Sequence, residues 1–167
     1  MFAPWIVFMM DPRCEPESES TKPKRDVMAV YAIREMTLED YEKAYDLWAK
    51  TEGVGLGRSD TREEIGKFLE RNPGHSFVCL FNDDIVGTVL CGHDGRRGFL
   101  YHVAVSEQHR SQGLGKKLVD AALDRLRSAG IHKCHLMVYA GNEAGQRFWE
   151  KTAWERREDI LIYSKNT

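Results

Sequence analysis

Two glycines stand at the start of an expected helix, directly after a strand and a polar turn. Gly113 and Gly115 follow the apolar run Val103–Val105, and Arg110 lies in the turn between them. A glycine in the first helical turn costs about 1 kcal/mol relative to alanine, so stability alone does not favour two of them. Free backbone N–H groups at a helix start, with the positive end of the helix dipole behind them, bind phosphate. The stretch therefore predicts a phosphate or pyrophosphate site.

Two commoner glycine motifs do not fit this stretch. A P-loop requires G-x-x-x-x-G-K-S/T, but Arg110 replaces its first glycine and Lys117 its hydroxyl residue, which disfavours a nucleotide-dependent kinase. The dinucleotide-binding fingerprint needs a third glycine where Leu118 stands. The pattern that remains is Arg110-x-x-Gly113-x-Gly115 between a strand and a helix. Its alternative is an ordinary strand-to-helix turn that tolerates glycine.

Length and composition indicate one ordinary globular domain. The chain has 167 residues, 42% hydrophobic and 30% charged, with a formal net charge of -2, which disfavours a basic nucleic-acid binder. Four cysteines without a C-x-x-C pair favour a reducing cytoplasm. Residues 1–27 combine a short apolar start, too short to span a membrane, with a Pro-, Glu-, Ser- and Lys-rich run. We expect a disordered N-terminal tail over 1–27 and the functional domain over 28–167.

Hydrophobic periodicity predicts alternating strands and helices from residue 30 onward. Strands are expected over 30–33, 76–81, 85–91, 99–105, 134–139 and 160–163, and helices over 37–50, 60–71, 113–129 and after Asn142. Asn82, Asp83 and Asp84 favour a tight hairpin turn, and Asp60 or Thr61 can cap the second helix. A helix crosses between strands 99–105 and 134–139, so these two should be parallel. The expected fold is α/β, with a mixed, mostly antiparallel sheet and helices on both faces.

The glycine stretch resembles the acyl-CoA-binding signature Q/R-x-x-G-x-G/A of the GNAT superfamily, the Gcn5-related N-acetyltransferases. The order of elements from Val30 to Tyr163 resembles the same fold. Two further pieces, Asp94–Gly98 and the run from Asn142 through Phe148-Trp149-Glu150-Lys151, are similar to a bacterial subgroup related to the ribosomal-protein alanine N-acetyltransferases. The resemblance implies a central parallel pair of strands that splays at the cofactor site.

The resemblance also implies where acetyl-CoA, the co-substrate, binds. Backbone groups of the Val103, Ala104 and Val105 strand would pair with the pantetheine arm, and N–H groups of the following turn would hold the pyrophosphate. The implied cofactor residues in and after this turn are Arg110, Gln112, Gly113, Leu114, Gly115, Lys116 and Asn142. For Lys116 a solvated helix face is an alternative, and Asn142 is either a cofactor ligand or only an N-cap.

Catalysis needs a base, because an acceptor amine is largely protonated at neutral pH. The resemblance places the strand base near Phe99 or Tyr101, of which Tyr101 is the better placed. The tyrosine that serves relatives as general acid corresponds to Trp149, whose indole N–H cannot act as that acid. His102 is an alternative base, but strict alternation places it opposite Tyr101 and favours a structural role. Tyr101 and Trp149 are therefore the predicted catalytic positions.

The predicted function is transfer of acetyl from acetyl-CoA to a primary amine, with a protein N-terminus leading and small-molecule amines open. An alternative is a non-catalytic acyl-CoA-binding sensor or partner-binding module of the same fold. No metal, nucleic-acid or membrane partner is expected; His132, Cys134 and His135 lack zinc-site spacing. The oligomeric state stays open, with a homodimer among the alternatives.

Overall fold

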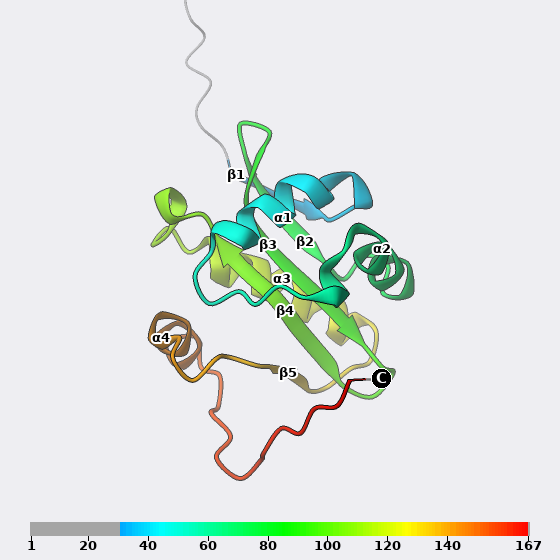
Figure 1. Ribbon diagram of the computed structural model, residues 1–167, viewed down its shortest axis with the longest axis vertical. Helices are drawn as coiled ribbons and strands as arrows, with labels where there is room; N and C mark the ends of the chain where they lie inside the picture. Colours follow the sequence, from blue (N-terminus) through cyan, green and yellow to red (C-terminus); the bar gives the residue numbers. More distant parts are fainter. Residues whose placement is uncertain (1–30, 167) are drawn as a thin grey trace, which may run out of the picture.

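The computed structural model describes residues 31–166 and places a five-stranded sheet between helices (Figure 1). The predicted tail over 1–27 lies outside the described residues. The strands are β1 (Tyr31–Glu35), β2 (Phe77–Phe81), β3 (Asp84–His93), β4 (Gly98–Val105) and β5 (Cys134–Leu136). The helices are α1 (Tyr41–Lys50), α2 (Arg62–Arg71), α3 (Leu114–Ser128) and α4 (Glu143–Lys151), with short 3-10 turns η1 (Leu38–Asp40), η2 (Arg58–Asp60) and η3 (Glu107–His109).

The sheet has the order β1-β2-β3-β4-β5, antiparallel throughout except for the parallel pair β4 and β5. Asn82 and Asp83 join β2 to β3 with φ angles of 49° and 67°. Two consecutive left-handed residues form the hairpin turn whose twist matches the flanking strands. The predicted mixed sheet and its hairpin are confirmed.

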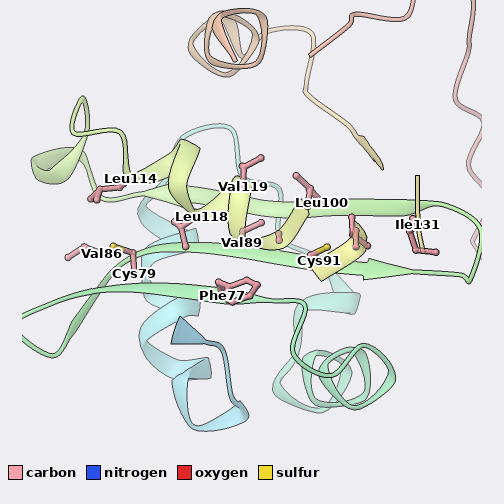
Figure 2. Close-up of a cluster of buried hydrophobic side chains, with 12 residues drawn as sticks. Phe77, Cys79, Val86, Val89, Cys91, Leu100, Leu114, Leu118, Val119 and Ile131 are labelled. Atoms are coloured by element: carbon pink, nitrogen blue, oxygen red, sulfur yellow. The ribbon is translucent and has the colours of Figure 1, made fainter. Parts of the chain in front are cut away.

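Each face of the sheet is covered by helices. Leu118 of α3 is fully buried against one face, where it meets Cys79 and Val89 of the strands (Figure 2). Trp48 of α1 is fully buried against the other face, together with Ile65 of α2. Figure 1 shows α1 and α2 on the opposite side of the sheet from α3. The prediction of helices on both faces is therefore confirmed.

The two parallel strands separate soon after they pair. β4 and β5 are in register only from Gly98 opposite Cys134 to Leu100 opposite Leu136. The strand predicted over 134–139 therefore ends early, because its later residues diverge from β4. Residues Val103–Val105 keep β3 as a neighbour on one side, and within the described residues no strand pairs with them on the other. Apart from the Val105 carbonyl, which accepts from Arg110 Nε, their backbone groups on that side are open to a ligand.

The strand predicted over 160–163 is wrong. Leu161, Ile162 and Tyr163 are exposed and form no strand, although Figure 1 shows this segment returning in the direction of the sheet. An apolar β-branched run favours a strand, but it also needs a neighbouring edge with which to exchange hydrogen bonds. β5 offers only three residues for such pairing, and it remains an edge strand of the described sheet.

One ion pair joins β1 to the start of the first helical segment and gives a pH-dependent prediction. Arg34 donates to both carboxylate oxygens of Asp40 at 2.7 Å, and the Thr37 N–H donates to the same carboxylate at 2.9 Å. The Arg34 guanidinium therefore holds the pKa of this buried carboxyl below its usual range. A lowered native pKa stabilises the fold above the unfolded pKa of about 3.9, and the stabilisation is lost as the pH falls through the native value.

We expect Asp40→Asn to lower the unfolding free energy by about 1–3 kcal/mol near neutral pH, the range for hydrogen bonds to charged groups. The difference from wild type should shrink below about pH 4. Urea denaturation at neutral and acidic pH measures both values. The exposed Asp46, changed to Asn, is the control and should stay within about 0.5 kcal/mol of wild type. A difference of equal size at both pH values would contradict the role of the ionised pair.

Candidate active site

A cavity of about 1700 Å³ opens where β4 and β5 diverge. This exceeds the roughly 300–1,000 Å³ of a site for one drug-sized ligand, so there is room for an extended ligand and a second molecule beside it. We call one side the donor half, formed by Val103–Val105, the turn into α3 and the start of α4. We call the other side the acceptor half, formed by residues 51–55 and 59–60 with Phe68, Tyr101 and His102.

The donor half is organised by the N-terminus of α3. Gly113 is the N-cap residue with φ 75°, and a Cβ added there would meet no atom within 4 Å. The left-handed backbone explains the glycine, and the open space leaves the first N–H groups of a 15-residue helix accessible. Arg110 folds back from the turn and donates from Nε to the Val105 carbonyl at 3.1 Å. The turn thus has the features of an anion site.

The predicted cofactor residues of the turn differ in what they offer. Gln112 is exposed and is the one member of the predicted set that does not line the cavity. Leu114 is 2% exposed, with its side chain in the core, so only its backbone can serve a ligand. Lys116 pairs with Asp120 at 2.6 Å on the solvent face of α3. At this turn the backbone N–H groups are therefore more available to an anion than the charge of Lys116 is.

Helix α4 closes the donor half. A Cβ at Gly115 would lie 3.3 Å from the Phe148 ring, so the close approach of α4 to α3 favours a glycine there. Asn142 accepts from the Gly145 N–H at 2.8 Å, which confirms it as the N-cap of α4. A Cβ at Gly53 would lie 2.1 Å from Asn142 Nδ2. The glycine-rich segment of the acceptor half therefore meets the donor half at Asn142.

Both predicted catalytic positions line the cavity. Tyr101 is 38% exposed and lies beside the rings of Phe68 and Phe99. Burial raises the pKa of its phenol, with Cys134 and Cys91 adding to the effect. The phenol therefore remains protonated at neutral pH and is a hydrogen-bond donor rather than a base. Trp149 packs edge-on against Phe148 and Trp154 and forms part of the cavity wall.

A β-bulge brings one further histidine into the cavity. His102 and Val103 of β4 together lie opposite Val89 of β3, and His102 has φ 48°. Strict alternation fails at this point, so His102 and Tyr101 both line the cavity, contrary to the expected opposite faces. Its Nε2 lies 2.7 Å from Oδ1 of Asp60. No local sequence signal marks the bulge.

Asp60 has a different role from the predicted helix cap. Thr61 caps α2, with its hydroxyl accepting from the Glu64 N–H at 3.4 Å. Asp60 accepts instead from the Gly57 N–H at 2.7 Å and contacts His102. The carboxylate therefore links the α1–α2 segment to the bulge of β4.

Comparison with known proteins identifies the family. The sequence matches the acetyltransferase (GNAT) family over residues 31–154. The chain belongs to this family. An acetyltransferase of Pectobacterium atrosepticum is 31% identical over 130 residues, which are 78% of this chain and 92% of that protein. The predicted GNAT membership is confirmed, and the protein is an acetyl-CoA-dependent acetyltransferase.

Solved structures of other GNAT proteins share the fold. The ribosomal-protein-alanine N-acetyltransferase of Brucella melitensis has a TM-score of 0.64 at 20% identity, covering 81% of this chain and 99% of that one. The PaiA N-acetyltransferase of Thermoplasma acidophilum, solved with coenzyme A, has a TM-score of 0.66 at 16% identity, covering 74% of this chain and 88% of that one. In residues 31–166 of this acetyltransferase, no helix has the length and apolar character to cross a membrane.

Proposed function

We propose that this acetyltransferase binds acetyl-CoA along the donor half and transfers the acetyl group to the α-amino group of a protein or peptide N-terminus. The observation that carries the proposal is the open edge of Val103–Val105 leading into the accessible N–H groups at Gly113. An extended pantetheine arm can pair with the strand edge, and a pyrophosphate fits the helix start. Gly115 and Lys116 extend the same turn.

The acceptor class is inferred from the acceptor half. Glu52 contributes an exposed carboxylate to its lining, and a carboxylate attracts an ammonium group. An α-amino group has an ordinary pKa of about 7.7–8.0 against about 10.4 for lysine, so it loses its proton more readily near neutral pH. A ribosomal-protein-alanine N-acetyltransferase among the solved structures of this fold adds support for a protein N-terminus.

The proposed chemistry assigns roles to groups along β4. Backbone N–H groups of Val103 and Val105, on the side of β4 away from β3, polarise the thioester carbonyl, because donors aimed at the developing oxyanion lower the barrier. Tyr101 supplies a protonated phenol that can donate toward the leaving sulfur. Trp149 forms the wall beside the thioester and takes no part in proton transfer.

An acceptor panel tests the proposal. The enzyme is incubated with acetyl-CoA and peptides with free N-termini, and products are identified by mass spectrometry. Matched peptides with a blocked N-terminus and a single lysine are the control, and polyamines, free amino acids and aminoglycosides complete the panel. We expect Nα-acetylated peptides. Acetylation confined to lysine or to small amines would contradict the proposed acceptor.

Asn142 yields a prediction that separates its two proposed roles. Asn142→Ala removes the N-cap of α4 and should lower the unfolding free energy by about 1 kcal/mol. Asn142→Asp keeps the cap acceptor but loses the amide N–H donor, so its stability should match wild type. If the Asn142 amide also donates to acetyl-CoA, the Asp variant should bind acetyl-CoA more weakly. Calorimetric titration measures this, and unchanged affinity in Asn142→Asp limits Asn142 to the cap.

A further inference from the structure

The acceptor half contains a partly buried histidine–carboxylate pair. His102 Nε2 and Asp60 Oδ1 are 2.7 Å apart, and each side chain is 12% exposed. We propose that His102 is the general base that takes a proton from the acceptor ammonium, and that Asp60 positions it. The proposal rests on the proposed function. It assigns the base to His102 because Tyr101, the position predicted for the base, carries a protonated phenol.

Several neighbouring residues hold His102 in place. Its left-handed backbone is unfavourable for a bulky residue, yet the Thr88 hydroxyl donates to the His102 carbonyl at 2.8 Å. The buried Trp48 in turn donates its indole N–H to that hydroxyl at 2.8 Å, and its ring lies 4.6 Å from the imidazole. A strained residue held by several contacts is typical of a functional site.

The hydrogen bonds of Asp60 determine which nitrogen of His102 is free. An ionised carboxylate only accepts hydrogen bonds, and Asp60 already accepts from Gly57. His102 therefore carries its proton on Nε2, and Nδ1 keeps a lone pair. Within residues 31–166, His102 Nδ1 has no hydrogen-bond partner. Among these residues His75 Nε2 is the one side-chain polar atom that is both buried and unpartnered. His102 Nδ1 is therefore accessible to solvent. Nδ1 is thus available to a substrate in the cavity.

The proton balance is complete with this base. Nδ1 takes one proton from the acceptor ammonium, and the free amine forms a C–N bond to the acetyl carbon as the C–S bond breaks. The nitrogen loses its second proton to the departing sulfur, which leaves as the CoA thiol. The imidazolium then releases its proton to solvent, which restores the base.

Few other ionisable groups surround the pair. Tyr41 of α1 donates to the Asp60 carbonyl at 2.8 Å, so its phenol is already engaged. Tyr45 packs edge-on against Trp48, and Tyr101 stays protonated. Glu52 lies two residues after the end of α1 and is exposed. His102 is therefore the partly buried base that hydrogen bonds hold in place in the acceptor half.

His102→Gln tests the proposal, because it keeps an N–H donor for Asp60 and removes the basic nitrogen. We expect kcat with a free N-terminal peptide to fall about 100-fold or more. The acidic limb of the pH profile of kcat/KM, which is the fall in activity at low pH, should disappear. Acetyl-CoA affinity should stay within about twofold of wild type. His93→Gln, a half-buried histidine that does not line the cavity, is the matched control and should keep wild-type kcat.

A second pair of variants separates catalysis from folding. Asp60→Asn should lower kcat about 10-fold or more and move the acidic limb, since it no longer favours the Nε2–H tautomer. His102→Ala should recover activity on addition of imidazole, even if His102→Gln does not fold. The proposal is overturned if His102→Gln folds and keeps the wild-type kcat and the wild-type acidic limb. It is also overturned if the variants lose activity while the acidic limb stays in place and imidazole does not rescue His102→Ala. A wild type that acetylates no amine overturns the proposed function as well.

Discussion

Gly113→Asp should bind acetyl-CoA about 30-fold more weakly than wild type, or worse, in calorimetric titration. The backbone at Gly113 faces open space at the N-terminus of α3, where the pyrophosphate is proposed to bind. Two unit charges 4 Å apart repel by about 1 kcal/mol in water and about 4 kcal/mol near a protein surface. A loss of about 2 kcal/mol corresponds to the expected 30-fold.

Two control variants separate charge from backbone strain. Gly113→Ala imposes the same left-handed strain without the charge and should retain most of the affinity. Gly95→Asp adds the same charge at a glycine with φ 90° and open space around it, in the β3–β4 turn away from the cavity. It should bind acetyl-CoA as wild type does. Equal affinity of wild type and Gly113→Asp would contradict the pyrophosphate site.

Thr88→Val should lower the unfolding free energy by about 2–6 kcal/mol without leaving a cavity. Thr88 is fully buried, accepts the Trp48 indole N–H and donates to the His102 carbonyl. Valine has nearly the same shape, but it removes the hydrogen bond of the buried Trp48 indole N–H and that of the partly buried His102 carbonyl, at about 1–3 kcal/mol each. Because the hydroxyl also holds the bulge, kcat should fall with stability. Urea denaturation and steady-state kinetics measure the two effects.

Thr51→Val is the matched control. Its hydroxyl donates at 2.7 Å to the Leu47 carbonyl, one turn earlier at the end of α1, and the residue is only half-buried. Removing this bond should cost less than about 1 kcal/mol, since water can replace it. If Thr88→Val were as stable as Thr51→Val, the bulge would not depend on the buried hydroxyl.

The donor half could be predicted from the sequence because it is local. Val103–Val105, the turn and the start of α3 follow one another along the chain, so their spacing alone indicates a strand edge leading into a helix N-terminus. The N-cap at Asn142 and the hairpin turn at Asn82–Asp83 could be predicted for the same reason. Both features depend on residues that lie within three positions of one another in the sequence.

The acceptor half could not be predicted, because it depends on non-local contacts. Asp60 and His102 are 42 residues apart in sequence, and they meet only because β4 contains a bulge. A bulge shifts the face of every later side chain, and the regular alternation of apolar residues does not reveal one. The missing strand at 160–163 has a related cause, since pairing depends on the length of the edge that β5 offers.

The most direct test of the account is release of the CoA thiol from acetyl-CoA, followed with a thiol reagent over many turnovers. With a free N-terminal peptide, we predict steady release that matches the amount of acetylated peptide and stops when the peptide is omitted. Binding of acetyl-CoA without thiol release, across the whole acceptor panel, would contradict the account and favour a non-catalytic acyl-CoA-binding module of the same fold.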